Sequence, residues 1–153
     1  MGSNSNFIVR EMHLPCIIVK RLCNQDKRTY IMAVDASTRS KEGLSMLLTL
    51  ISPKDNLIIV HVEELSQKEG ESSSSETKDY YESEIKTWCP PGSKYMSFLP
   101  EDKTVSDRLL EYIDEIDPDF LVLAPSSLKT NTSVSDYLLT KTNSNVILFK
   151  HHE

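Results

Sequence analysis

Short runs of consecutive apolar residues recur along the chain, and segments with helical spacing separate them. Four of these runs are rich in β-forming residues and lie at residues 29–34, 57–62, 120–124 and 146–149. Strands that are apolar throughout, with no alternation of polar residues, are typical of a parallel sheet buried on both faces. A further, outer strand is predicted at Lys94–Leu99, directly after a Pro-Pro-Gly turn.

The segments between these runs carry apolar stripes of the kind found on amphipathic helices. The two clearest stripes are Leu44, Leu47, Leu48 and Ile51, and Val105, Leu109, Tyr112, Ile113 and Ile116. A weaker stripe consists of Tyr81, Ile85 and Trp88. Strands and helices therefore alternate, which predicts an α/β fold whose parallel sheet has helices on both faces.

Two of the predicted helices begin with a polar residue that can cap them. Thr104 with Asp107 resembles a capping box, and Ser133 with Asp136 makes a similar box before the last helix. Pro118 lies just beyond the end of the helix that Thr104 begins, as expected where a helix stops.

One acidic, Ser-rich segment, Glu64–Lys78, breaks the alternation, and Leu65 is its only large apolar residue. Such a composition buries too little to order itself, so we expect a mobile surface loop that proteases cut at Lys68 or Lys78. The segment is either a plain solvated insertion or a cluster of phosphorylated serines that alters the choice of partner.

The 153 residues suffice for one domain with a full core. A net charge of -6 argues against nucleic acid or an anionic membrane as the main partner, and no apolar run approaches a membrane span. Cys16, Cys23 and Cys89 form neither a disulfide framework nor a zinc site. With no signal peptide visible, they indicate reduced thiols in a cytoplasmic protein.

The carboxyl ends of the predicted strands are the expected ligand site of an open α/β sheet. The residues there are Asp35, Ser37, Val62, Glu63 and Ala124 to Ser127, together with Ser133 at the start of the last helix. A helix N-terminus suits a phosphate, but Ser133 also serves as a plain N-cap. Asp35 has a second interpretation as the residue that ties down its loop. His61, inside a strand, is either a satisfied core residue or a catalytic residue.

The known catalytic and phosphate-binding motifs are absent from the sequence. It contains no GxxxxGK[ST] loop, no GxGxxG after the first strand, no GxSxG elbow and no metal-ligand spacing. No nucleophile stands beside a base, so we expect no catalytic or metal-binding residues and, at most, weak ATPase activity.

Several stretches, taken in order, resemble the universal stress protein family. These are "YIMAVDASTRSKEGLSMLL", "LIIVHVEE", "IDEIDPDFLVLAPSS" and "TSVSDYLLTKTNSNVILFK". The resemblance covers about Thr29 to Lys150, and it implies a five-stranded parallel sheet of order 3-2-1-4-5. It also implies stress response as the biological role, with pairing of two domains through their fifth strands.

Family members of one class bind ATP through a glycine signature. The positions that match it are Ala124, Ser127 and Thr132-Ser133, so none of its glycines is present, and the interval is shorter than the signature requires. A side chain where backbone must approach a phosphate is a steric obstacle. The resemblance nonetheless gives candidate residues for weak binding of ATP or AMP: Asp35, Ser37, Val62, Ala124, Ser127, Thr132, Ser133 and Ser135.

The N-terminal segment, residues 1–20, resembles the same closing helix and strand. Ser3, Ser5, Ile17 and Lys20 match Ser133, Ser135, Ile147 and Lys150. The segment is therefore interpreted as the remnant of a preceding domain, with residues 21–28 as linker and 29–150 as the domain. The alternative is that any short helix before an apolar strand would align equally well.

An uncovered apolar edge strand is an aggregation hazard. We therefore expect Leu14–Lys20 to run antiparallel beside Asn145–Lys150, either within one chain or from a dimer partner. Pro15 fits only near the start of such a strand or on its open side.

Three functions remain. The first is a stress-response module that acts through dimerisation or contacts with unknown protein partners, with weak or lost nucleotide binding. The second is a nucleotide sensor or slow ATPase that binds ATP or AMP. The third, a ligase or an electron-transfer flavoprotein subunit, requires a Gly- and Ser-rich loop after the first strand, which "DASTRSKEG" does not provide.

Overall fold

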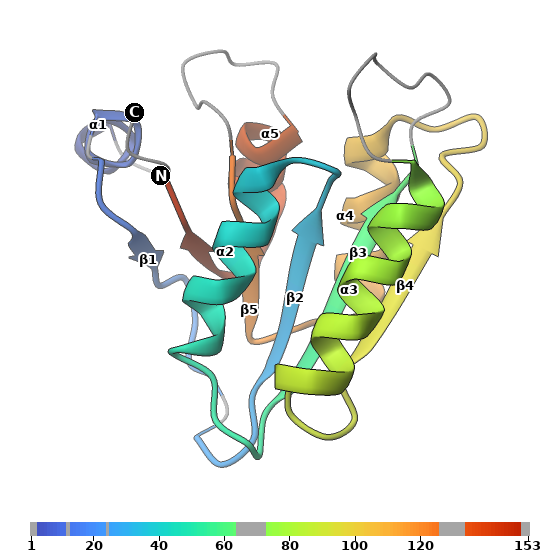
Figure 1. The fold of residues 1–153 in the computed structure, drawn as a ribbon. Coiled ribbons are helices and arrows are strands. Elements are labelled where there is room, and N and C mark those ends of the chain that lie inside the picture. Colours follow the sequence, from blue (N-terminus) through green and yellow to red (C-terminus); the bar gives the residue numbers. More distant parts are fainter. Residues whose placement is uncertain (1–2, 12, 24, 64–72, 126–133, 151–153) are drawn as a thin grey trace.

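A six-stranded sheet forms the centre of the molecule (Figure 1). The structure is a computed structural model, and it describes residues 3–11, 13–23, 25–63, 73–125 and 134–150. In chain order the elements are α1 (Ser3–Glu11), β1 (Cys16–Ile18), β2 (Thr29–Val34), α2 (Thr38–Leu48), β3 (Asn56–Val62), α3 (Ser74–Trp88), β4 (Lys94–Phe98), α4 (Val105–Ile116), β5 (Phe120–Leu123), α5 (Val134–Lys141) and β6 (Asn145–Leu148). All the predicted strands and helices are therefore present.

The strand order is β1-β6-β5-β2-β3-β4, and β2 to β6 run parallel. Counted from β2, this is the predicted order 3-2-1-4-5, so the predicted fold class is confirmed. The central strand β2 is fixed between its neighbours, because Met32 pairs with Ile59 on one side and with Val122 on the other.

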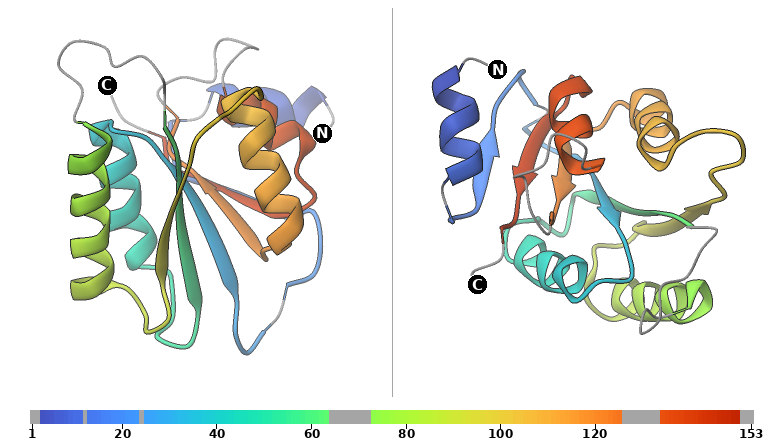
Figure 2. Two further views of the ribbon diagram at one scale, coloured as in Figure 1. Left: turned by 90° about the vertical axis from the view of Figure 1, so that its right-hand side faces the viewer. Right: turned by 90° about the horizontal axis from the view of Figure 1, so that it is seen from above.

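The helices cover the sheet from both sides (Figure 2). α2 and α3 lie over one face, where Leu44, Leu47 and Tyr81 are buried against side chains of β2 and β3. α1, α4 and α5 lie over the other face, where Leu109 and Leu138 belong to the second core cluster. The apolar stripes therefore face the sheet, as amphipathic helices on a doubly covered sheet should.

Helix α3 begins earlier than predicted. Ser73 caps it, the hydroxyl accepts a hydrogen bond from the Glu76 N–H at 3.1 Å, and the Glu76 carboxylate accepts one from the Ser73 N–H at 2.8 Å. The prediction of a loop up to Lys78 is therefore wrong for Ser74–Lys78, which are helical. The rest of that predicted loop, residues 64–72, lies outside the described residues.

The cap at Thr104 matches the prediction, because its hydroxyl accepts a hydrogen bond from the Asp107 N–H at 3.1 Å. The helix ends at Ile116, its C-cap Asp117 has a left-handed φ of 52°, and Pro118 follows. Ser133, the other predicted cap, lies outside the described residues.

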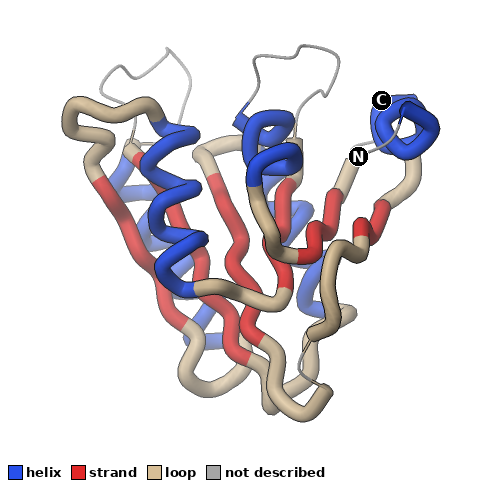
Figure 3. Tube along the Cα trace, turned by 180° about the vertical axis from the view of Figure 1, so that it is seen from behind, coloured by secondary structure: helices blue, strands red, loops and turns tan. Residues whose placement is uncertain are grey.

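The N-terminal strand β1 pairs antiparallel with β6 of its own chain, at the edge of the sheet (Figure 3). Cys16, Ile17 and Ile18 stand opposite Leu148, Ile147 and Val146. The predicted antiparallel pairing is thus confirmed within one chain, although the strand is shorter than Leu14–Lys20. Pro15 precedes its first residue, where the missing N–H costs no ladder bond.

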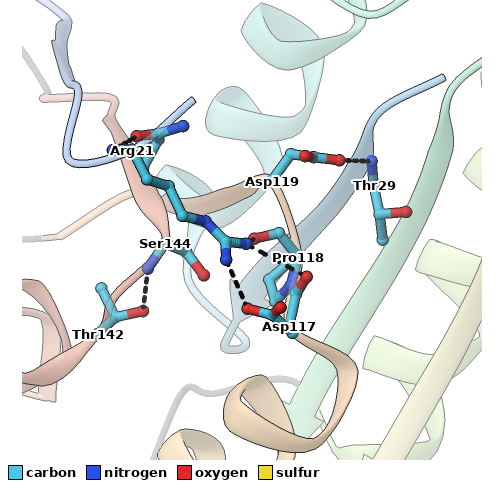
Figure 4. Close-up of polar contacts among 8 residues, drawn as sticks. Arg21, Thr29, Asp117, Pro118, Asp119, Thr142 and Ser144 are labelled. Atoms are coloured by element: carbon cyan, nitrogen blue, oxygen red, sulfur yellow. Dashed lines mark hydrogen bonds and ion pairs between the residues drawn. The ribbon is translucent and has the colours of Figure 1, made fainter. Parts of the chain in front are cut away.

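The segment after β1 is anchored near the starts of β5 and β6, where Arg21 contacts Asp117 and Pro118 (Figure 4). The backbone N–H groups of Lys20 and Arg21 donate to Oδ1 of Asn145 at 2.7 and 3.0 Å. The Arg21 guanidinium donates to the Pro118 carbonyl at 2.6 Å and forms an ion pair with Asp117 at 2.8 Å. The start of β2 is fixed nearby, where the Thr29 N–H donates to the Asp119 carboxylate at 2.8 Å.

Among the described residues, none of the helices combines the length and the apolar character that crossing a membrane requires.

Candidate functional site

The candidate site lies at the carboxyl ends of β3, β2 and β5, which are adjacent strands. Val34 at the end of β2 pairs with His61 of β3, and Met32 pairs with Val122 of β5. The polar turn after β2 is therefore flanked by Glu63 on one side and Ala124 on the other. Predicted residues from three separate segments meet at one edge of the sheet, as the carboxyl-end rule requires.

Asp35 organises the turn between β2 and α2. Its Oδ1 accepts hydrogen bonds from the Ser37 N–H at 2.9 Å and from the Ser40 hydroxyl at 2.8 Å. The Ser40 hydroxyl in turn accepts one from the Asp35 N–H at 3.1 Å. Asp35 thus ties down its loop, as one of its two interpretations predicted, while its side chain stays exposed to solvent.

Ser37 is the N-cap of α2. Its backbone is extended, and its hydroxyl accepts a hydrogen bond from the Ser40 N–H at 3.3 Å. Ser37 and Asp35 therefore belong to one local network, and the serine hydroxyl is engaged in capping.

Val62 and Ala124 contribute packing to the site. Val62 is buried and belongs to the core cluster that contains the buried side chains of α4. Ala124 packs against α2 on the other face, because a Cβ built on Gly43 would lie 2.8 Å from the Ala124 Cβ. The methyl group of Ala124 therefore occupies the space between the end of β5 and the helix.

Of the remaining predicted residues, only Ser135 lies in the described part of the chain. It is half-buried in the first turn of α5. Ser127, Thr132 and Ser133 lie outside the described residues.

A histidine–tyrosine pair lies next to the turn, and sequence reasoning did not find it. Nδ1 of His61 is 3.1 Å from the hydroxyl of Tyr95, across the β3–β4 pairing. Burial raises the pKa of Tyr95 to about 12, so the phenol remains protonated at neutral pH. A protonated phenol can donate to an imidazole nitrogen, so His61 is a core residue held by a hydrogen bond, as one of its two interpretations predicted.

Tyr81 of α3 covers this pair. Its ring stacks on that of Tyr95, with centroids 6.2 Å apart, and burial raises the pKa of its hydroxyl. That hydroxyl lies near Ser40, but the two form no hydrogen bond of normal geometry. The hydroxyl of Thr77, one turn earlier on α3, is also buried without a partner. α3 thus carries two buried hydroxyl groups, and it covers the same face of the sheet as α2, the helix that contains Ser40.

Within the described part of the chain, no group of three or more His, Cys, Asp or Glu side chains could hold a metal ion. The site therefore offers a carboxylate, hydroxyl groups and one imidazole. These groups can hold a ligand by hydrogen bonds, and the Ser40 hydroxyl already donates to the Asp35 carboxylate as part of the turn.

No protein-family model matches the sequence, and neither does any curated protein. Solved structures do match the fold. A universal stress protein family protein from Arabidopsis thaliana with AMP bound is 18% identical over 81% of this chain and 92% of that chain, with a TM-score of 0.61. The universal stress protein from Archaeoglobus fulgidus in complex with dAMP is 19% identical over 79% and 96%, with a TM-score of 0.59.

A universal stress protein from Lactobacillus plantarum is 16% identical over 80% of this chain and 97% of that chain, with a TM-score of 0.61. These matches agree with the strand order and with the helices on both faces of the sheet. The chain therefore has the fold of the universal stress protein family.

Proposed function

We propose that this chain is a universal stress protein-like module that acts through dimerisation or other protein contacts, with weak or lost nucleotide binding. The observation that carries the proposal is the side chain of Ala124. Its methyl group lies so close to α2 that a Cβ at position 43 would come within 2.8 Å of it. The resemblance places a signature glycine at position 124, so the end of β5 is filled where a phosphate site needs exposed backbone.

The local hydrogen bonds support the same proposal. Asp35 and Ser37 are committed to the turn and to the cap of α2, and the Val62 side chain is buried in the core cluster that contains the buried side chains of α4. A nucleotide would therefore find Oδ1 of Asp35 and the Ser37 hydroxyl already engaged in the network that holds the turn.

The alternative is an ATP- or AMP-binding sensor, and one observation favours it. Asp35 is exposed at the carboxyl end of β2 and makes its described bonds through Oδ1. A carboxylate there can accept hydrogen bonds from the hydroxyl groups of a ribose. Two of the solved proteins with this fold were determined with AMP or dAMP bound.

Isothermal titration with ATP distinguishes the two functions. We expect a dissociation constant of about 100 μM or poorer, which is no better than roughly -5.5 kcal/mol. Mass spectrometry of gently purified protein should find no stoichiometric nucleotide. Low-micromolar binding that Asp35→Ala weakens would support the sensor and contradict the proposal.

We also propose that α1 and β1 are equivalent to α5 and β6, as the remnant of a preceding domain would be. The two units make matching contacts across β1 and β6. Nζ of Lys20 donates to the Leu139 carbonyl at 2.7 Å, and Nζ of Lys150, at the matching position, donates to the Val9 carbonyl. Val9 and Leu139 match in the same alignment, and both are buried. These reciprocal contacts support a local two-fold relation between the units.

A further inference from the structure

Exposed apolar side chains are concentrated near the N-terminus, in α1, in β1 and in the residues around β1. Among the described residues, eleven large hydrophobic side chains are exposed, and six of them lie between positions 7 and 22: Phe7, Ile8, Leu14, Ile17, Val19 and Leu22. Two of these, Ile17 and Val19, lie in or directly after β1, the strand at the edge of the sheet. A concentration of this kind on an edge strand marks an interaction site.

The residues in and directly after β6 that match Ile17 and Val19 in the alignment are buried, whereas Ile17 and Val19 are exposed. Ile147 stands opposite Ile17 and is 3% exposed, whereas Ile17 is 58% exposed. Phe149 matches Val19, and their exposures are 5% and 73%. The side chains on β6 are buried with α2, but those on β1 have no such cover.

The two edges of the sheet differ in their protection. β4, at the far edge, carries the exposed polar residues Lys94 and Ser97. Residues 14–19, Leu-Pro-Cys-Ile-Ile-Val, contain no charged side chain. Natural sheets protect their edges with charges, prolines and very short strands. β1 is short and follows Pro15, but the charges are missing from this edge.

We propose that β1 pairs antiparallel with β1 of a second copy of this chain, so that two six-stranded sheets join about a two-fold axis near Ile17. This inference rests on the proposed function and names its partner and surface. The pairing repeats one that the chain already makes, because β1 lies antiparallel to β6 with Ile17 opposite Ile147, its matching residue.

The two-fold geometry is free of charge conflict. With Ile17 opposite Ile17 of the second copy, Cys16 stands opposite Ile18 and Lys20 opposite Leu14, so no like charges meet. The contact uses the same surface on both copies, and it closes at a dimer with no free β1 edge left for growth.

Sedimentation velocity and light scattering on the full chain test the pairing over a concentration series from about 1 to 200 μM, a range chosen for a short-strand contact. We expect a concentration-dependent dimer. Ile17→Lys should weaken it about tenfold or more, because it introduces two like charges at the axis. Met46→Lys, which changes an exposed apolar residue of α2, is the matched control and should leave the dimer intact. Circular dichroism checks that both variants remain folded.

A disulfide trap tests the axis directly. In a chain with its three cysteines replaced by serine, Ile17→Cys should give a linked dimer under mild oxidation, since directly opposite Cβ atoms come within bonding reach. Leu50→Cys, at another exposed apolar position, should not. A monomer at all concentrations, or a dimer that Ile17→Lys leaves unchanged, overturns the pairing. The ATP titration is read separately, so tight nucleotide binding would contradict the proposed function without touching this result.

Discussion

The contact between Gly43 and Ala124 sets the distance between α2 and the end of β5. Adding a methyl group at position 43, and removing the one at position 124, tests whether this contact is tight. A Cβ on Gly43 would lie 2.8 Å from the Ala124 Cβ and 3.1 Å from the Cε of Met32. Ordinary carbon contacts are about 3.5–4.0 Å, so both approaches are too close. Gly43→Ala must therefore push the helix away from the sheet, although alanine is the better helix former.

Two opposing effects decide how much Gly43→Ala changes the free energy of unfolding. Replacing a helical glycine by alanine gains about 1 kcal/mol of helix propensity. Overpacking a dense core costs about 1–3 kcal/mol, and the upper part of that range applies because the Ala124 Cβ is fixed to the backbone and cannot rotate away. We therefore expect Gly43→Ala to lower the free energy of unfolding by about 1–2 kcal/mol.

The assay is urea unfolding followed by circular dichroism for four proteins: wild type, Gly43→Ala, Ala124→Gly and the double variant. Ala124→Gly alone should cost about 1–2 kcal/mol, from a lost buried methyl and a more flexible backbone. In the double variant the clash with the Ala124 Cβ is gone, and only the approach to the flexible end of Met32 remains, so the two changes should couple favourably by about 1 kcal/mol or more. Ser45→Ala, on the exposed side of α2, is the control and should be neutral or stabilising. Additive effects, or a stabilised Gly43→Ala, would refute the reasoning.

Three further outcomes are expected. Burial raises the pKa of Tyr95 to about 12, so the stability that it contributes is complete below about pH 10, its pKa when unfolded, and is lost as pH rises through 12. Urea titrations over this range should show a smaller loss for Tyr95→Phe. Deleting residues 1–20 removes β1 and uncovers β6, so light scattering should show aggregation or an altered state of association. A soluble protein that associates as the full chain does would contradict the role of β1. Trypsin should cut at Lys68 before Lys78, because Lys78 lies inside α3, and mass spectrometry of the first fragments shows the order.

Periodicity alone located the strands and helices, because consecutive apolar residues and helical stripes report burial directly. It failed at the start of α3, where a run of serines has the composition of a loop. The signal was present, since Ser73 and Glu76 have the spacing of a capping box, and the structure forms both of its hydrogen bonds. Composition was the wrong guide here because a helix start needs only one well-placed cap.

The strand order and the pairing of β1 came from the resemblance and from the internal similarity of the two ends. Contacts that depend on strand register could not be predicted from the sequence. His61 and Tyr95 meet because β3 and β4 pair with Ile59 opposite Tyr95, and nothing in either strand alone specifies that alignment. The engagement of Asn145 with the backbone of Lys20 and Arg21 is of the same kind.

The unit formed by α1 and β1 and the unit formed by α5 and β6 contact each other symmetrically, but they differ in their contacts to the rest of the domain. Contacts between the units are reciprocal: the lysine of each donates to a helix carbonyl of the other, and Ile17 faces Ile147. Contacts to the rest of the domain exist for one unit only, since β6 is paired with β5 and β1 has no strand on its outer side. The edge of β6 is already occupied within the chain, so a second copy cannot pair there without displacing β1. Any association that extends the sheet on this side must therefore use the outer edge of β1, where Ile17 and Val19 are exposed.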